Sequence, residues 1–256
     1  MFSTWEFFVL LSTIVKMKSL IIILYLFTFQ SIIAQADFGK LANQQSVREE
    51  LGVIGSGKMI NGYGFNNDYK GILGSPFLFD DWAAGVLVLS AKPDKIYTNV
   101  QLKFDSYKNE LWLLFEKDSS ILYSKDVISF ALGSGNKPFR EFTIPDRSKK
   151  FCQVIYSDST YILIKEERKI LIKSNYVNKG MYATGDKYDR FKDDSRYYIS
   201  KEGDLFKPFN MKKGSFEALT PKNRIRDLKS FMNREKFDNT LTDGQAIVLF
   251  QFLLEN

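Results

Sequence analysis

The stretch that decides the fold is "VQLKFDSYKNELWLLF" at residues 100–115. Its first part, Val100–Asp105, alternates apolar and polar residues, as a strand with one buried face does. Ser106–Asn109 has the composition of a turn. The apolar run that follows predicts a second, more deeply buried strand. The stretch therefore predicts an antiparallel hairpin.

Similar segments continue to residue 209, rich in the β-branched and aromatic residues that favour strands. They are "SSILYS", "DVISFAL", "FREFTI", "KFCQVIYS", "TYILIKEE", "RKILIKS" and "RYYISKE". Between them stand short connections, such as "SDS" at 157–159, "ER" at 167–168 and "EGD" at 202–204. Connections this short predict an antiparallel meander over residues 72–210, either an open sheet or a partial barrel. The 23 Phe and 13 Tyr of the chain suit the core of such a sheet.

Residues 211–256 have a helical pattern instead. In "LTPKNRIRDLKSFMNREKF" the apolar residues recur at helical spacing, and Thr220 is the expected N-cap. Thr242 and Gln245 form a capping box for a second helix. Ile247–Leu254 is apolar nearly all round, which predicts a buried helix. The chain is therefore expected to be mainly β, with a C-terminal helical pair packed on the sheet, and α+β overall.

The N-terminal stretch "KMKSLIIILYLFTFQSIIAQA" is typical of a secretory signal peptide. It has a basic start, a short apolar segment and the small-residue ending Ala34–Ala36. A retained anchor would need the apolar part of residues 2–15 as well, and Lys16 and Lys18 would then lie inside the membrane. We predict that residues 1–36 are removed and that the protein is exported, to the periplasm or beyond the cell. Residues 1–16 are either a misassigned start or an extension of the signal.

Residues 37–71 are predicted to form a flexible Gly-rich segment. Within it, "GVIGSGKM" matches the spacing of a phosphate-binding loop. Such a loop needs Ser or Thr after the lysine to hold Mg²⁺, and here the residue is Met59. The flanking segments are polar and turn-like rather than a buried strand and a helix. We expect no nucleotide at this site.

Composition excludes several chemistries. The chain has no histidine, so catalysis by Ser-His-Asp or Cys-His groups is excluded within it, as is a His-based zinc site. Its one cysteine, Cys152, lies in a predicted strand and is expected to be a buried, inert thiol. The net charge of +6 is spread along the chain, which does not favour a nucleic-acid partner. No cofactor or metal is expected.

The candidate binding residues are Asp80, Asp81, Trp82, Asp105 and Tyr107. Sugar hydrolysis uses two carboxylates, and an aromatic side chain beside them could hold a sugar. Adjacent residues of a strand point to opposite faces, so the second carboxylate would have to come from another segment. The alternative is structural: a turn in which the aspartates accept backbone hydrogen bonds and the tryptophan is part of the core.

Two segments carry a family resemblance: "GSPFLFDDWAAGVLVL" at residues 74–89, and Phe104–Leu111 with its flanking strands. With them the chain resembles a group of uncharacterised exported β-rich proteins of Bacteroidota, over roughly residues 70–255. The resemblance implies export and a β-rich fold, and it brings no known activity.

Three functions remain open. The favoured one is a non-catalytic module that binds a protein or glycan of the cell envelope and presents an exposed aromatic patch. The second is a polysaccharide hydrolase with two carboxyls in an aromatic-lined cleft. The third is an envelope protein anchored in the membrane by a retained N-terminal segment.

The first prediction concerns the N-terminus. Because a small-residue site ends at Ala36, N-terminal sequencing and intact mass of the protein from its native host should show a chain that begins at Asp37. That chain should be found in the periplasmic or culture fraction. A chain that begins at Met1 or Met17 in the membrane fraction would show that the segment is retained.

Overall fold

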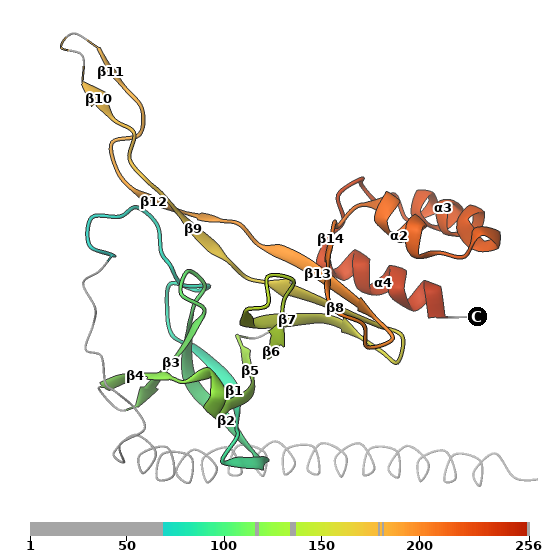
Figure 1. Ribbon diagram of the computed structural model, residues 1–256, viewed down its shortest axis with the longest axis horizontal. Coiled ribbons are helices and arrows are strands. Elements are labelled where there is room, and N and C mark those ends of the chain that lie inside the picture. Colours follow the sequence, from blue (N-terminus) through green and yellow to red (C-terminus); the bar gives the residue numbers. More distant parts are fainter. Residues whose placement is uncertain (1–68, 116–117, 134–136, 179, 181, 255–256) are drawn as a thin grey trace, which may run out of the picture. The chain divides into compact units, whose positions relative to one another are not determined.

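The computed structural model describes residues 69–115, 118–133, 137–178, 180 and 182–254 (Figure 1). The expected signal peptide and the "GVIGSGKM" run lie outside these residues. The described elements all belong to one compact unit, Leu51–Asn256. Within the described ranges, no helix has the length and apolarity that a membrane span requires.

Ten strands form one open antiparallel sheet, in the order β14-β13-β8-β7-β6-β5-β1-β2-β3-β4. Two further pairs, β9 with β12 and β10 with β11, lie outside it. The predicted mainly β fold with C-terminal helices is confirmed. The strands are β1 (Ala83–Leu89), β2 (Lys92–Asp105), β3 (Glu110–Phe115), β4 (Asp118–Leu122), β5 (Val127–Leu132), β6 (Lys137–Thr143), β7 (Lys149–Ser157), β8 (Tyr161–Glu166), β9 (Lys169–Ile172), β10 (Val177–Asn178), β11 (Ala183–Thr184), β12 (Arg190–Asp193), β13 (Arg196–Lys201) and β14 (Lys207–Phe209).

The predicted hairpin at residues 100–115 is present as β2 and β3. Asp105 pairs with Glu110, and the register continues to Gln101 opposite Leu114. β2 starts earlier than expected, because its first part pairs with β1. The sheet is otherwise the expected meander, except that β1 lies between β2 and β5 and joins the two halves.

The prediction that "ER" at 167–168 turns a hairpin is wrong. β8 pairs with β13 and β9 pairs with β12, and both pairings keep one register, so that Glu166 faces Arg196 and Lys169 faces Asp193. Residues 161–201 therefore form one long hairpin, which we call the ribbon (Figure 1). A short connection between two strand-like segments can be a hairpin turn or an interruption within one continuous strand. Only the strand with which each segment pairs distinguishes these alternatives.

The main core of the sheet is a stack of phenylalanine rings. Phe104, Phe130, Phe139 and Phe151 come from β2, β5, β6 and β7, and each is almost fully buried. The Phe130 and Phe139 rings stack with centroids 4.8 Å apart, and Phe104 lies 5.3 Å from Phe139. The aromatic residues of the alternating pattern thus meet on one face of the sheet, as predicted.

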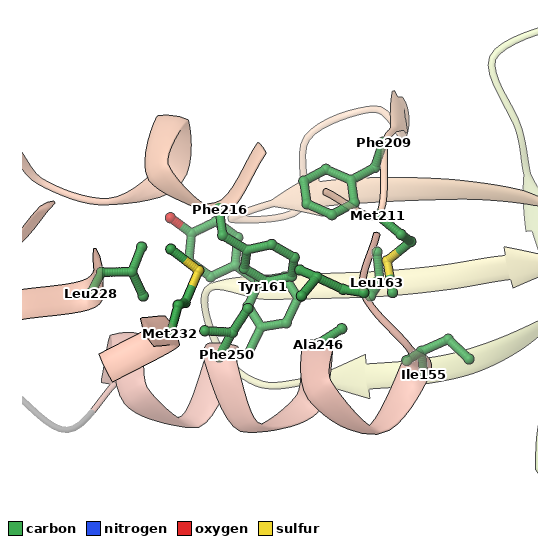
Figure 2. Close-up of a cluster of buried hydrophobic side chains, with 12 residues drawn as sticks. Ile155, Tyr161, Leu163, Phe209, Met211, Phe216, Leu228, Met232, Ala246 and Phe250 are labelled. Atoms are coloured by element: carbon green, nitrogen blue, oxygen red, sulfur yellow. The ribbon is translucent and has the colours of Figure 1, made fainter. Parts of the chain in front are cut away.

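A second core holds the helices on the sheet. The helices are α2 (Lys213–Leu219), α3 (Ile225–Arg234) and α4 (Asp243–Leu254). Figure 2 shows Phe216 of α2, Tyr161 of β8 and Phe250 of α4 gathered in this core. The Phe216 and Phe250 ring centroids are 5.1 Å apart, and Tyr156 of β7 stacks on Phe250 at 4.7 Å. Leu228 and Met232 of α3 belong to it as well, so the core joins all three helices to β7 and β8.

Two details of the helical prediction need correction. Thr220 does not cap α3, because it ends the additional helix α2, where its hydroxyl donates to the Phe216 carbonyl oxygen at 2.7 Å. α4 is not buried all round, because Val248 and Leu254 are exposed. The capping box is confirmed: the Thr242 N–H donates to the Gln245 side chain, and the Gln245 N–H donates to the Thr242 hydroxyl.

Removal of the Phe250 ring should release the helices from the sheet. Phe250→Ala leaves a cavity among three aromatic neighbours and should lower the free energy of unfolding by roughly 3–5 kcal/mol, measured by chemical denaturation. Val248→Ala, on the exposed side of the same helix, should cost less than about 1 kcal/mol. Equal losses in the two variants would contradict this packing.

Candidate functional site

Asp105 is a buried carboxylate at the end of β2, and it organises the turn that follows. Its Oδ1 accepts hydrogen bonds from the backbone N–H groups of Tyr107 at 2.9 Å and Lys108 at 2.8 Å. Its Oδ2 accepts one from the Tyr69 hydroxyl at 3.0 Å. Burial raises the pKa of Asp105 above its usual value, although these hydrogen bonds act in the opposite direction. Asp105 thus acts as the acceptor of an Asx turn inside the fold.

Glu110 is the cross-strand partner of Asp105. Burial raises the pKa of its carboxyl group and the charge of Asp105 adds to the rise, while the charge of Lys108 and a hydrogen bond from the Trp112 side chain lower it. Its Oε2 atom and the Trp112 Nε1 atom are both buried, and the indole N–H of Trp112 is the donor that acts on this carboxyl group. The structure therefore does bring two carboxyls together, as hydrolysis of a sugar would require. However, both oxygens of Asp105 are bound within the protein and the residue is fully buried, so this pair does not offer a substrate two free carboxyls.

The turn between β2 and β3 also joins distant parts of the sheet. The Asn109 side chain makes two hydrogen bonds with the backbone of Phe151 on β7. Its Nδ2 donates to the carbonyl oxygen at 3.1 Å, and its Oδ1 accepts from the N–H at 2.8 Å. The Ser106 carbonyl oxygen accepts the N–H of Lys169, the first residue of β9, at 3.2 Å. In the sheet, β6, β5, β1 and β2 lie between β7 and β3, so these bonds require the sheet to curl.

Tyr107, a predicted binding residue, contributes to the base of the ribbon. Its ring lies edge-on to Phe191 of β12, with centroids 5.3 Å apart, and 6.3 Å from Tyr69. Tyr69 and Phe191 are themselves 5.4 Å apart. The three rings form an aromatic cluster over the Asp105 turn, and Tyr107 keeps 41% of its surface exposed.

Asp80, Asp81 and Trp82 lie in the loop before β1. Both aspartates are exposed, and Trp82 is half-buried. The ammonium group of Lys103, on β2, binds the Asp80 carbonyl oxygen and lies 5.9 Å from the centre of the Trp82 ring. Lys103 thus holds this loop on β2 through the Asp80 backbone and leaves both Asp80 and Asp81 exposed. The structure brings Asp80 and Trp82 together around Lys103, and Asp105 and Tyr107 together in the turn.

The largest group of exposed tyrosines was missed by sequence reasoning. It lies at residues 173–189, which we call the ribbon end, where Tyr176, Tyr182 and Tyr188 are 41%, 72% and 48% exposed. Val177 beside them is 48% exposed. Every described residue from 173 to 188 is exposed, so no described part of this segment is a packed core. Its signal in the sequence was a tyrosine every six residues, in a segment that also holds two Asn and two Gly.

Polar side chains hold the ribbon end in place of a core. Ser174 donates its N–H to Asp189 Oδ1 at 2.7 Å and its hydroxyl to the Asp186 carbonyl oxygen at 2.9 Å. Asn175 Oδ1 accepts the Asp186 N–H at 2.7 Å. A Cβ atom at Gly185 would lie 2.5 Å from the Asn175 carbonyl oxygen, and φ there is +88°, so glycine is needed at this crossing.

A charged network fastens the ribbon to the helices. Lys165 Nζ lies 2.9 Å from Glu167 Oε1 and 3.6 Å from Asp243 Oδ2, in the first turn of α4. Tyr197 donates its hydroxyl to Asp243 at 2.7 Å, and Ser195 donates to Glu167 at 3.0 Å. Burial alone would lower the pKa of Lys165, but the hydrogen bonds and charges of its two acidic partners raise it overall. We interpret this network as structural, because each of its groups is paired within the protein.

Cys152 is the buried thiol that the sequence predicts. It is fully buried in a cluster with Ile144, Ile164 and Tyr198. Burial raises the pKa of the thiol to about 12, and the charge of Glu166 contributes. The thiolate, which is the reactive form, is therefore disfavoured at neutral pH.

Comparison of the chain with family models, curated proteins and solved structures found no match.

The raised pKa of Asp105 predicts a pH dependence. Between 3.8 and the raised value, the folded chain holds a proton that the unfolded chain has lost, so the free energy of unfolding falls as pH rises across this range. The destabilisation that comes from burying the charged carboxylate is absent below pH 3.8 and complete above the raised pKa. Asp105→Asn keeps an acceptor oxygen for the turn and removes this destabilisation. The free energy of unfolding of the variant, minus that of the unchanged protein, should therefore increase as pH rises. Chemical denaturation at several pH values measures this difference.

Asp81→Asn is the matched control, because Asp81 is exposed. Its difference from the unchanged protein should be small and nearly independent of pH. A pH-independent difference for Asp105→Asn, or one that shrinks as pH rises, would contradict the burial argument.

Proposed function

We propose that this chain is an exported, non-catalytic binding module of the cell envelope, and that it holds a protein partner with its ribbon end. The observation that carries the proposal is the group of three exposed tyrosines, Tyr176, Tyr182 and Tyr188, on a hairpin end whose described residues form no packed core. Support for export comes from the signal-like N-terminal stretch.

The composition of the ribbon end favours a protein as the partner. Residues 173–189 combine tyrosine with Ser, Asn, Gly and Thr, which is the mixture that antibody loops use to bind proteins. Tyrosine supplies a large contact area at a low cost in conformational entropy, and its hydroxyl can bind a polar partner. The small polar residues supply adaptable hydrogen bonds.

The bracing of the ribbon end favours binding with little reorganisation. Its backbone is fixed by bonds such as those of Ser174 to Asp189 and Asp186. A surface that is already ordered loses less entropy when it binds. At its base the ribbon is held by the aromatic cluster of Tyr69, Tyr107 and Phe191. The tyrosines are thus presented on a supported element.

The ribbon end carries three lysines and two aspartates, which gives it a net charge of only +1. Lys173 pairs with Asp189 at 2.8 Å, and Arg190 at its base pairs with Asp186 at 3.2 Å. A surface without a strong field of one sign does not favour a highly charged partner such as nucleic acid. The partner is expected to contact the rings rather than to be attracted from a distance.

The test is photo-crosslinking in the native host, because the partner is unidentified. A photoreactive phenylalanine analogue in place of Tyr182 should give one discrete protein adduct, identified by mass spectrometry, since Tyr182 is the most exposed of the three tyrosines. The added substitutions Tyr176→Ser and Tyr188→Ser should lower the adduct yield at least about tenfold, as removal of aromatic contact residues does at other interfaces.

The matched control places the same analogue at Leu205, which is 84% exposed in the loop between β13 and β14. Leu205 should give no discrete adduct. The same adduct from both positions would contradict the proposal, and an adduct with glycan would replace the protein partner by a sugar.

A further inference from the structure

An open pocket lies where β14 leaves the edge of β13. The two strands pair over three residues only, and the last pair is Tyr197 with Phe209. Past this point the chain turns away from β13, and Lys212 forms a bridge with Thr240 instead. The divergence leaves a pocket of about 380 Å³. The pocket is separate from the ribbon end, so an inference about it does not rest on the proposed function.

The charged groups that line this pocket are cations. Among its described lining residues, Arg196 of β13 and Lys212, just before α2, carry positive charge and none carries a carboxylate. Both residues are exposed, and 52% of the Arg196 side-chain surface is accessible. A ligand in the pocket can therefore reach both charged groups.

The positive charge of these two residues is incompletely paired. Asp194 lies 3.2 Å from the Arg196 guanidinium, but the same carboxylate oxygen also lies 3.6 Å from Arg168. One carboxylate thus serves two guanidinium groups. Lys212 has no ion pair with another described residue. An anion that enters the pocket finds cations that other acids do not fully occupy.

The two acids behind the pocket are held by the protein itself. The Ser195 hydroxyl donates to Glu167, and the Tyr197 hydroxyl donates to Asp243. Lys165 lies 2.9 Å from Glu167 and 3.6 Å from Asp243. These acids do not line the pocket, but their negative charge disfavours a ligand with more than one negative charge.

Neutral polar groups and an apolar wall complete the lining. The side chains of Asn210 and Thr240 are exposed and form no hydrogen bond with other described residues, so both can donate to a ligand. Pro208, Phe209 and Met211 supply apolar surface. Convergent polar groups beside an apolar wall match a ligand with one charged end and an apolar body.

We propose that this pocket binds a carboxylate group on a short apolar body, with the carboxylate on Arg196 and Lys212 and the body against Pro208 and Phe209. The planar guanidinium group matches a carboxylate through two parallel hydrogen bonds. Such a group occurs in short-chain organic acids and at the C-terminus of a peptide. The chemistry of the two sources is the same at the binding site, so the experiment must distinguish them.

The experiment is an NMR titration of the folded chain at neutral pH with butyrate and with butyramide, which has the same shape without the charge. Butyrate should bind saturably and shift the backbone amide signals of Arg196 and Lys212. Butyramide should bind at least about tenfold more weakly. Inorganic phosphate, which has charge but no apolar body, should also bind more weakly than butyrate.

Two variants should change butyrate binding in opposite directions. Lys212→Gln should weaken it at least about threefold, because an accessible charge is removed. Asp194→Asn should tighten it at least about threefold, because it removes the acid that competes for the Arg196 guanidinium. A variant that only damaged the fold would not tighten binding. Lys222→Gln, at an exposed lysine outside the pocket, is the matched control and should leave the Kd unchanged.

Comparison of butyrate with N-acetylvaline, which mimics the C-terminus of a peptide, distinguishes the two sources, since the tighter ligand identifies its class. Four results would overturn the proposal: equal Kd values for butyrate and butyramide, tighter binding of phosphate than of butyrate, an unchanged Kd in Lys212→Gln or in Asp194→Asn, or no saturable shift at all.

Discussion

The structure depends on the way the turn after β2 is held. Asp105 is buried away from solvent, and its two oxygens accept hydrogen bonds from the turn and from Tyr69. Asn109 binds the backbone of β7 with both the nitrogen and the oxygen of its side-chain amide. φ at Asn109 is 59°, a left-handed conformation that asparagine tolerates better than most residues. Without these bonds, the N–H and carbonyl groups of Phe151 would be left unpaired at the point where the ribbon leaves the sheet.

The same arrangement explains why one hairpin runs on beyond the sheet. β8 pairs with β7 from Ser157 to Gln153, and past that point the β2–β3 turn replaces it as the partner of β7. The ribbon continues as β9 and β12, and its base contacts the turn through Lys169 and Phe191. The cost of a long two-stranded hairpin, which is marginal alone, is thus offset at its base by the aromatic cluster and at its end by polar bonds. The tyrosines of the ribbon end remain exposed.

Much of the fold could be predicted because its signals are local. The alternation in Val100–Asp105 fixed the hairpin, and the Thr242–Gln245 capping box fixed the start of α4. Pairing between distant segments could not be predicted. The sequence near Glu167 suits either a turn or a break in a strand, and only the partner of β9 decides between them. Asp105 was a candidate binding residue because its burial could not be read from the hairpin alone: one of its oxygens is bound by Tyr69, from a segment that periodicity does not place.

The position of the exposed tyrosines could not be predicted from the sequence. An exposed aromatic patch was expected of a binding module, and aromatic residues around Asp80 and Tyr107 were the first candidates. In the structure Lys103 contacts Trp82, and Tyr107 packs against Phe191. The tyrosines of the ribbon end were not recognised, because the misread connection at 167–168 hid the length of the hairpin that presents them.

The most direct test of this account is amide hydrogen exchange along the ribbon, followed residue by residue by NMR. The account predicts that Ile170 and Lys192, which pair in β9 and β12, exchange slowly, as the amides of β8 and β13 do. Exchange in β9 and β12 at the rate of an unstructured chain, with slow exchange confined to β8 and β13, would contradict it. The ribbon would then end at Glu166, and the tyrosines would lie on a loop without support.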